Sequence, residues 1–365
     1  MKRLVCLFCA ALFLFLTACG PRAETPSPTP EPTPTAAPTP TPKPAPTPEL
    51  TPTPTPEPEF YHPLTGVPVE EDLSGKKPVA VMLNNIRAAL PQQGNSRADI
   101  IYEVLAEGGI TRMVAIYLEV GGEEIIASIR SARQYFWELA QGHDAVYVHA
   151  GGSPEFYNNK AASGAYTVDG VNGDYTSASI FWRDRYRVEG HDRFGFEHSL
   201  VTSGDAIAEL LGKKDLLTHT EGYTYEMSFA DDGTPAGGQA ANVITAPFSS
   251  KNTVFRYDAE TGLYRVEEFD APYIDGNSNS QIAVTNVLIL QTACKVYDDK
   301  GRIDVDLSSG SGYFACGGRM IPITWKKGAA KEQLRYFTAD GAPLTLGRGK
   351  SYVAIIPLNR SVTAE

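Results

Sequence analysis

The chain has 365 residues, of which 42% are hydrophobic, and this is enough for one large domain or two medium ones. Its formal net charge of −11 argues against nucleic-acid binding, because proteins that wrap nucleic acid present a basic stripe to the phosphates. We therefore expect no nucleic-acid partner.

Residues 1–18 have the pattern of an export signal. A short basic start precedes an almost unbroken apolar run, Leu4 to Leu16, which is short for a membrane-spanning helix. The next letters, TAC, complete a resemblance to the lipobox of bacterial lipoproteins, in which the cysteine receives diacylglycerol. The alternative is an ordinary secretory signal that ends near a cysteine. We predict a signal peptide over 1–18, lipidation at Cys19 and anchoring in a lipid bilayer through the acyl chains.

Residues 19–59 contain the lipidation site and a Thr-Pro array. Such a composition cannot bury apolar surface, so we predict a disordered, proline-rich tether with an extended, polyproline-like conformation. At about 3.1 Å per residue, about forty residues reach roughly 120 Å. This length would hold the folded part within or beyond a cell-wall layer. The expected location is the outer face of the cytoplasmic membrane, lipid-anchored and extracytoplasmic.

Residues 60–215 alternate apolar strand patterns with helical patterns, which is typical of an α/β region with a mixed sheet and flanking helices. The two strands that surround Gly121-Gly122 are candidates for a hairpin. The expected strands are 77–85, 111–120, 124–130 and 144–152, and the expected helices are 96–109, 132–142, 153–162 and 203–213.

Residues 216–361 show short strand patterns with DG and GG turns and almost no helix signals. We predict a β-rich region here. The sequence leaves open whether it shares a core with the α/β region.

Two arginines lie where a strand pattern passes into an aromatic helix, in the stretch SIRSARQYFWEL. Ser131 and Gln134 match a capping box, so we expect the helix to begin at Ser131, with Arg133 in its first turn. Cations at this positive end of a helix need a negative partner. In open α/β sheets, ligands collect at the carboxyl ends of parallel strands. If the strands here are parallel, one rim gathers a set of polar groups: Asn84, Asn85, Arg130, Arg133, His149 and the Gly151-Gly152 turn.

The negative partner of these arginines has two candidate identities. Glu103 and Glu107 lie four residues apart on one face of the predicted helix 96–109, and they could hold Arg112, Arg130 or Arg133 in a structural network. Alternatively, the arginines bind an anionic or carbohydrate ligand, and these two roles can coexist. The third alternative is scattered surface charge without either role. The stretch FWRDRYR adds Arg183, Arg185 and Arg187 between aromatic residues, and on a strand these three would share a face.

Catalytic and metal-binding templates match poorly. The sequence has no HExxH and no GxSxG motif, and its GSGYFACGG stretch leads into a strand pattern, unlike a dinucleotide-binding loop. We expect no metal and no cofactor, and the catalytic residues, if any exist, are unknown. Cys294 and Cys316 are the cysteines that remain beyond Cys19, and they either form a disulfide or remain two thiols.

Several strings together resemble the DUF3048 family. PLTGVPV, PVAVMLNN, ADIIYEVLAEGGITRMVAIY, RSARQYF, YVHAGGSPE and FWRDR are similar to its N-terminal domain, and VFRYDAETGLYRV, NVLILQT and ITWKK to its C-terminal domain. The resemblance implies an exported lipoprotein with an α/β region and a β-rich region, and no assigned reaction. In one loop this chain has Glu197-His198-Ser199 where the family typically has Pro-His-Asn. The polar positions that the resemblance implies are Asn85, Gln92, Asp99, Glu103, Glu107, Arg112, Arg130, Arg133, His149, Arg183 and His198.

We therefore expect a membrane-anchored lipoprotein that binds an anionic or carbohydrate ligand of the cell envelope. The alternatives are an envelope hydrolase that uses Glu103, Glu107 or His149, and a scaffold for envelope proteins. The expected partners are the bilayer and either a cell-wall polymer or an envelope protein. The candidate ligand-binding residues are Asn84, Asn85, Glu103, Glu107, Arg112, Arg130, Arg133, His149, Arg183 and His198.

Overall fold

The computed structural model describes residues 58–173, 179–225 and 227–365. The predicted signal peptide, Cys19 and nearly all of the tether lie outside these residues and stay predictions. The α-helices of the described part are α1 (Gln134–Gly142), α2 (Pro154–Ser163) and α3 (Gly204–Lys213). Its 3-10 helices are η1 (Arg87–Ala89), η2 (Asn95–Arg97), η3 (Glu107–Gly109) and η4 (Phe196–His198).

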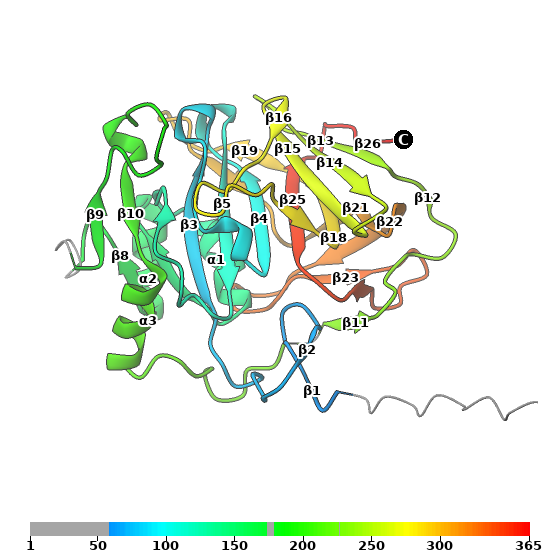
Figure 1. Ribbon diagram of the computed structural model, residues 1–365, viewed down its shortest axis with the longest axis horizontal. Helices are drawn as coiled ribbons and strands as arrows, with labels where there is room; N and C mark the ends of the chain where they lie inside the picture. Colours follow the sequence, from blue (N-terminus) through cyan, green and yellow to red (C-terminus); the bar gives the residue numbers. More distant parts are fainter. Residues whose placement is uncertain (1–57, 174–178, 226) are drawn as a thin grey trace, which may run out of the picture. The chain divides into compact units, whose positions relative to one another are not determined.

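A mixed 11-stranded sheet contains strands from both predicted regions (Figure 1). The C-terminal strand β25 pairs in parallel with β18 on one side and with β4 on the other, so the two regions share one sheet. The predicted fold class is confirmed. In spatial order the strands are β12 (Gln239–Ala240), β22 (Arg319–Lys326), β21 (Ser309–Cys316), β18 (Asn286–Thr292), β25 (Ser351–Pro357), β4 (Ile100–Leu105), β5 (Thr111–Tyr117), β3 (Val79–Asn85), β7 (Val146–His149) and β8 (Thr167–Asp169), with β23 (Arg335–Phe337) paired to β22.

The other sheets are smaller. A six-stranded sheet has the order β16 (Ala271–Pro272), β15 (Leu263–Glu268), β14 (Asn252–Asp258), β13 (Val243–Pro247) and β26 (Thr363–Ala364), with β17 (Ala283–Val284) on β15. A three-stranded sheet has the order β6 (Ile126–Ala127), β10 (Leu200–Thr202) and β9 (Phe181–Arg183). The two-stranded pairs are β1 (Phe60–Tyr61) with β2 (Pro68–Val69), β11 (Ser228–Ala230) with β24 (Thr345–Gly347), and β19 (Cys294–Val296) with β20 (Ile303–Val305).

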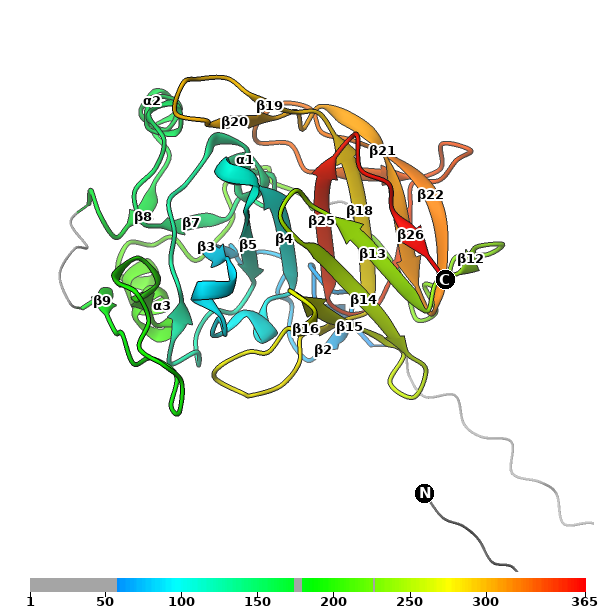
Figure 2. The ribbon, with the colours of Figure 1, turned by 90° about the horizontal axis from the view of Figure 1, so that it is seen from above.

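The large sheet is covered on both faces. Successive side chains of a strand point to opposite faces, and those of β3 divide accordingly between two hydrophobic clusters. Val81 and Leu83 belong to the cluster that includes Phe255 of β14, whereas Met82 belongs to the cluster that includes Phe136 of α1. Figure 2 shows α1 and β14 on opposite sides of β4. Two different environments therefore meet at the ends of the central strands.

The predicted helix 96–109 is wrong, because its central part is strand β4. Every residue of β4 is buried, and the strand lies between β25 and β5. A strand that is covered on both faces has a continuous apolar run, which periodicity cannot distinguish from a buried helix. The β-branched and aromatic composition of IIYEV favours the strand. Glu103 and Glu107 therefore do not share a helix face.

The predicted hairpin around Gly121-Gly122 is also wrong. β5 pairs with β3 and β4, whereas the short strand β6 pairs with β10. The FWRDRYR stretch likewise forms only the three-residue strand β9, so Arg185 and Arg187 lie beyond it and do not continue a common face with Arg183. Both errors arise because the pairing and the length of a strand depend on the partners that the fold supplies, and local alternation does not show those partners.

Two predicted helix starts are confirmed. The Ser153 hydroxyl accepts a hydrogen bond from the backbone N–H of Phe156 at 3.3 Å, with Pro154 at the first helical position of α2. Ser203 caps α3 in the same way, through the N–H of Ala206 at 3.0 Å.

Cys294 and Cys316 are both free thiols. Cys294 begins β19 in a two-stranded pair, and Cys316 ends β21 in the large sheet. Burial raises the pKa of each thiol to about 11. The sequence left open a disulfide or two thiols, and the structure has two thiols.

Candidate functional site

The strand ends that the sequence placed on one rim do lie together. β3 and β7 are parallel neighbours, and the extended segment 128–132 runs along their carboxyl ends. The Arg130 N–H donates to Met82 O at 2.9 Å, and the Ala150 N–H donates to Arg130 O at 2.9 Å. The backbone therefore holds Arg130 between the ends of the two strands.

This segment explains why the predicted capping box is wrong. Helix α1 begins at Gln134, and its N-cap is Arg133, whose side chain makes no capping hydrogen bond. Ser131 belongs to the extended segment, where its carbonyl accepts a hydrogen bond from Arg112 Nη1 at 2.8 Å. Gln134 turns its side chain to Glu138 at 2.7 Å. Pairing with the strand ends has outweighed the local capping preference.

Glu107 is the internal partner of two arginines. Its carboxylate accepts hydrogen bonds from Nε and Nη2 of Arg133, the latter at 2.9 Å, and it lies 3.5 Å from Arg112 Nη2. Burial alone would raise the pKa of Glu107, but the hydrogen bonds of Arg133 and the charge of Arg112 outweigh it and lower this pKa. One carboxylate thus serves two guanidinium groups.

Arg112 lies deepest in the group. Its side chain extends from β5 and only 6% of the residue is exposed. Burial, followed by the charge of Arg133, lowers the pKa of Arg112 to about 10. Its buried Nε atom has no hydrogen-bond partner within the described part of the chain. A buried donor without a partner is costly, so this atom is a point at which an acceptor would stabilise the protein.

Arg130 and Arg183 form the outer part of the site. Arg130 donates to Glu197 O at 3.1 Å and lies 3.7 Å from the Glu197 carboxylate, which is 73% exposed. Arg183 donates to Phe196 O at 2.6 Å and stacks over the Phe196 ring, with its Cζ atom 4.0 Å from the ring centroid. Burial and the nearby charge of Arg130 both lower the pKa of Arg183. The pair therefore presents two cations beside an exposed aromatic ring.

His198 joins this outer part to the end of β3. Its Nδ1 atom lies 3.0 Å from Asn84 Nδ2, and its carbonyl accepts from the Nε of the buried Arg187 at 3.2 Å. Burial and the charge of Arg130 lower the pKa of His198, so the imidazole is neutral near pH 7. We call Arg112, Arg130, Arg133 and Arg183 the arginine cluster. Glu107 and Glu197 face these four cations, which leaves two positive charges in excess.

The structure places three other predicted residues outside the arginine cluster. His149 is fully buried, with its ring nitrogens 2.9 Å from Gly151 O and 3.0 Å from Thr167 Oγ1, and burial lowers its pKa. Asn85 and Glu103 point to the opposite face of the sheet, since Asn85 follows Asn84 and side chains alternate. These three residues are enclosed by protein and present no group to the rim.

Glu103 belongs to a buried ionic group instead. The Lys251 ammonium lies 2.6 Å from Glu103 and 2.7 Å from Glu268, and all three side chains are almost completely buried. Asn85 Nδ2 donates to both carboxylates, at 2.9 Å and 3.0 Å. Burial raises the pKa of Glu268 to about 7. The charge of Lys251 opposes this shift, and the charge of Glu103 adds to it. This group fastens β14 and β15 to the central strands.

Sequence reasoning missed Lys251, Glu268 and Glu197. The first two come from the β13–β14 turn and the end of β15, more than a hundred residues after Glu103, and no local pattern connects them. Glu197 was visible as the substituted residue in Glu197-His198-Ser199. An acidic residue at this position, next to His198, was the signal in the sequence that could have indicated the ion pair between Glu197 and Arg130.

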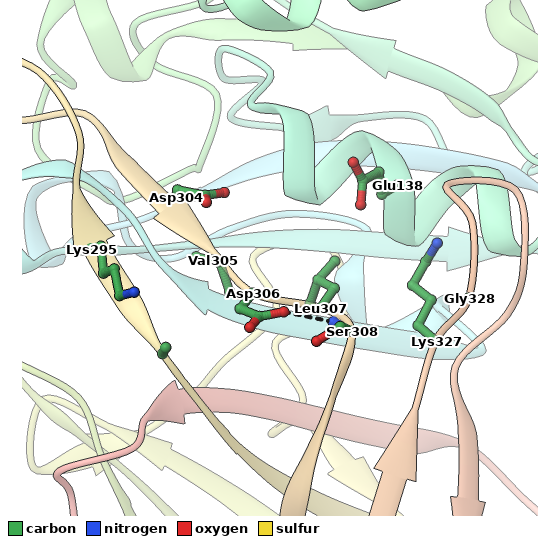
Figure 3. Close-up of a pocket in the computed structure, with 10 residues that line it drawn as sticks. Glu138, Lys295, Asp304, Val305, Asp306, Leu307, Ser308, Lys327 and Gly328 are labelled. Carbon is green, nitrogen blue, oxygen red and sulfur yellow. Dashed lines mark hydrogen bonds between the residues drawn. The ribbon is translucent and has the colours of Figure 1, made fainter.

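A polar cleft of about 350 Å³ lies between α1, the β19–β20 pair and the turn after β22 (Figure 3). Figure 3 shows acidic and basic side chains facing one another across it. The Lys327 ammonium already donates to Ala329 O at 2.9 Å and to Ala330 O at 2.7 Å. The charged groups that line the cleft are Glu138, Lys295, Asp304, Asp306 and Lys327. Three acidic groups against two basic ones leave one negative charge in excess, so this cleft does not favour an anionic ligand.

Within residues 58–173, 179–225 and 227–365, no group of three or more His, Cys, Asp or Glu side chains has an arrangement that could hold a metal ion. The helices of the same residues are too short or too polar to cross a bilayer.

Comparison with known proteins shows the family to which the chain belongs. Residues 64–216 match the family described as "Protein of unknown function (DUF3048) N-terminal domain", and residues 244–353 match its C-terminal domain. The Bacillus subtilis (strain 168) protein named "Putative lipoprotein YerB" is 31% identical over 300 residues, which is 81% of this chain and 86% of the relative. The crystal structure of YerB from Bacillus subtilis superimposes with a TM-score of 0.70 at 29% identity, and it covers 84% of this chain and 100% of that one.

Proposed function

The chain belongs to the DUF3048 family, and its relative is named "Putative lipoprotein YerB". We propose that this chain is a membrane-anchored lipoprotein whose arginine cluster binds an anionic ligand of the cell envelope. The observation that carries the proposal is the excess of two positive charges in the arginine cluster. Arginine forks match carboxylate and phosphate groups in two-pronged geometry, which suits acidic glycans and phosphate-bearing polymers.

Two further features support binding of a ligand with both charge and a ring. Phe196 is 63% exposed and lies under Arg183, so it offers a flat apolar surface beside two guanidinium groups. Arg130 and Arg183 also donate to the backbone carbonyls of Glu197 and Phe196, which fixes both guanidinium groups beside that ring. A sugar acid would supply a face for the ring and oxygen atoms for the guanidinium groups.

The internal environment favours binding over hydrolysis at this site. A hydrolase would use Glu103, Glu107 or His149 as its acid or base. Glu103 and His149 are fully buried, and Glu107 is bonded to Arg133 and Arg112. A general acid or base must come within hydrogen-bond reach of the substrate, so these placements weigh against the enzymatic alternative.

The proposed placement is the outer face of the cytoplasmic membrane. The tether of residues 19–59 would let the arginine cluster reach roughly 120 Å from the lipid. This reach suits a ligand in the wall layer.

The test is a binding titration with acidic glycans purified from bacterial cell walls. The full chain is compared with the double variant Arg130→Gln/Arg183→Gln, in which both outer cations are neutralised. The control is Arg256→Gln/Arg265→Gln, which removes two surface arginines of β14 and β15 and has the same net charge.

We expect the Arg130→Gln/Arg183→Gln variant to bind at least tenfold more weakly, because each charge-assisted hydrogen bond contributes about 1.5–3 kcal/mol. The control variant should bind like the unchanged protein. Equal binding by all three folded proteins would overturn the proposal.

A further inference from the structure

A second basic pocket lies at the same end of the large sheet, on the face opposite the arginine cluster. It has a volume of about 390 Å³ and is formed by the β13–β14 turn, η1 and the turn after β15. Its charged and hydroxyl-bearing lining includes Arg87, Ser249, Ser250, Lys251, Asp270 and Arg360. We call it the Arg87–Arg360 pocket.

The two arginines of this pocket have no acidic partner in the described residues. Arg87 Nη2 donates to Phe269 O at 2.9 Å, and its Cζ atom lies 5.2 Å from the centroid of the Phe269 ring. The Nε atom of Arg360 is buried and has no hydrogen-bond partner in the described chain. One arginine is therefore held in place by an aromatic ring, and the other retains a buried donor without an acceptor.

Lys251 lies beneath these arginines but contributes little free charge. Its ammonium is already bonded to Glu103 and Glu268 on the inner side. Arg87 and Arg360 are thus opposed in the lining only by Asp270, which leaves a single positive charge in excess. The pocket consequently suits one anionic group with several oxygen acceptors, such as a phosphate or a carboxylate.

The pocket and the arginine cluster are connected by two short pieces of chain. The turn η3 joins β4 to β5, and Glu107 at its start holds Arg133 and Arg112. Gly109 at its end packs against the pocket, since a Cβ atom there would lie 3.1 Å from Ser249 Cβ. Two residues of chain span at most about 7 Å. The two basic surfaces therefore lie next to each other, one on each side of η3.

The end of β3 gives the same result independently. Asn84 contacts His198 beside the arginine cluster, and Arg87 enters the pocket three residues later. Three residues of extended chain span about 10 Å. A ligand that crosses the end of the sheet could thus contact both surfaces without leaving the protein.

We propose that the Arg87–Arg360 pocket and the arginine cluster bind two anionic groups of one linear polymer that carries an anionic group on each repeat unit. This inference rests on the proposed function, because it requires the arginine cluster to bind an anion. It adds the class of ligand, a polyanion, and a second site at which that ligand is held. Binding two linked groups turns the second contact into an intramolecular step, so the polymer should bind far more tightly than its repeat unit.

The first experiment counts sites with inorganic phosphate as the probe. The full chain is titrated while the Nε–Hε signals of its arginines are followed by NMR. We expect two sites, one that moves the signals of Arg130 and Arg183 and one that moves those of Arg87 and Arg360. Arg87→Gln/Arg360→Gln should remove the second site alone, and Arg130→Gln/Arg183→Gln the first alone.

The second experiment measures affinity for polymers of graded length. Poly(glycerol phosphate) and oligogalacturonate distinguish a phosphodiester from a carboxylate source. We expect the preferred polymer to bind the unchanged protein at least tenfold more tightly than its repeat unit, and Arg87→Gln/Arg360→Gln to remove most of this gain. Arg256→Gln/Arg265→Gln should retain the gain and serves as the charge-matched control.

The outcomes separate the two claims. Unchanged polymer affinity in a folded Arg87→Gln/Arg360→Gln variant overturns the second site, and the proposed function survives if Arg130→Gln/Arg183→Gln still weakens binding. Polymer binding that needs Arg87 and Arg360 but not Arg130 and Arg183 overturns both the proposed function and the bridging polymer. Loss of polymer affinity in each double variant, with one phosphate site retained in each, supports the inference.

Discussion

Glu107 binds the guanidinium group of Arg133 through both of its carboxylate oxygens. The same carboxylate lies 3.5 Å from Arg112, so one acidic side chain orders two of the four cations in the arginine cluster. Protein therefore holds the cluster on its inner side. The structural network that the sequence suggested is present, and the ligand site on the outer arginines is our proposal.

The first prediction concerns Glu107. In Glu107→Gln, Arg112 and Arg133 lose their common counter-charge, so we expect a loss of roughly 1–3 kcal/mol in the free energy of unfolding. We also expect tighter phosphate binding, because the excess charge of the arginine cluster rises from two to three. Chemical denaturation and a phosphate titration measure the two effects.

Glu119→Gln is the control for this prediction, because Glu119 is an exposed partner of Lys76. It should change stability by less than about 1 kcal/mol and leave phosphate binding unaltered. A Glu107→Gln protein with unchanged stability would show that the paired oxygens contribute nothing to the fold.

The second prediction concerns the pH dependence of stability. The pKa of Glu268 is raised to about 7 by burial, from an ordinary value of 4.5. Between these values the native protein retains a proton that the unfolded chain releases. The contribution of Glu268 to stability is therefore greatest below pH 4.5, declines as the pH rises, and levels off above pH 7. The total decline is roughly 3 kcal/mol.

Glu268→Gln should remove this decline, whatever its effect on stability at a single pH. The measurement is the free energy of unfolding from pH 4.5 to 8 for the variant and the unchanged protein. Glu267→Gln changes the adjacent residue, which pairs with Arg256 at the surface, and should retain the decline. If the Glu268→Gln profile runs parallel to that of the unchanged protein, the raised pKa belongs to another group.

The third prediction concerns the two thiols. Burial raises the pKa of Cys294 and Cys316 to about 11, so at pH 8 only about one thiol in a thousand is ionised. We expect slow alkylation of the native protein and rapid addition of one label at each cysteine after denaturation without reductant. Mass spectrometry of peptides gives the count. Peptides joined through Cys294 and Cys316 would instead reveal a disulfide.

The fourth prediction concerns the anchor. Cys19→Ser should abolish incorporation of radiolabelled palmitate and release the protein from the membrane fraction, because a thioether-linked diacylglycerol supplies the two acyl chains that stable anchoring needs. Cys294→Ser is the control and should remain labelled. A Cys19→Ser protein that stays with the membrane would show that another contact holds it there.

Several features could be read from local patterns. The family strings, the fold class and the helices predicted over 153–162 and 203–213 all depend on neighbouring residues or on composition, and each is confirmed. The capping box at Ser131 failed for a physical reason. The backbone of 128–132 gains hydrogen bonds from the ends of β3 and β7, and these outweigh a cap that contributes about 1 kcal/mol.

The buried strand β4 shows a second limit. A strand enclosed on both faces loses the alternation that would identify it, and β4 is enclosed because β25 arrives from the far end of the chain to pair with it. The error in β4 carried over to Glu103. As a helix residue it would have faced the arginines, but as a strand residue it faces Lys251 and Glu268 on the other side of the sheet.

The sequence by itself determined the family and the fold class and singled out the arginines, because all of these reside in composition or in short contiguous motifs. It also predicts the anchor and the tether, nearly all of which lies outside the described residues. Only the tertiary structure decided which carboxylate each cation meets. Glu107 and Arg133 are 26 residues apart, and Glu103 meets Lys251 of the β13–β14 turn. Such partners are selected by the three-dimensional packing of strands, and a charge acts on whatever lies within a few ångströms of it rather than on its neighbours in the chain.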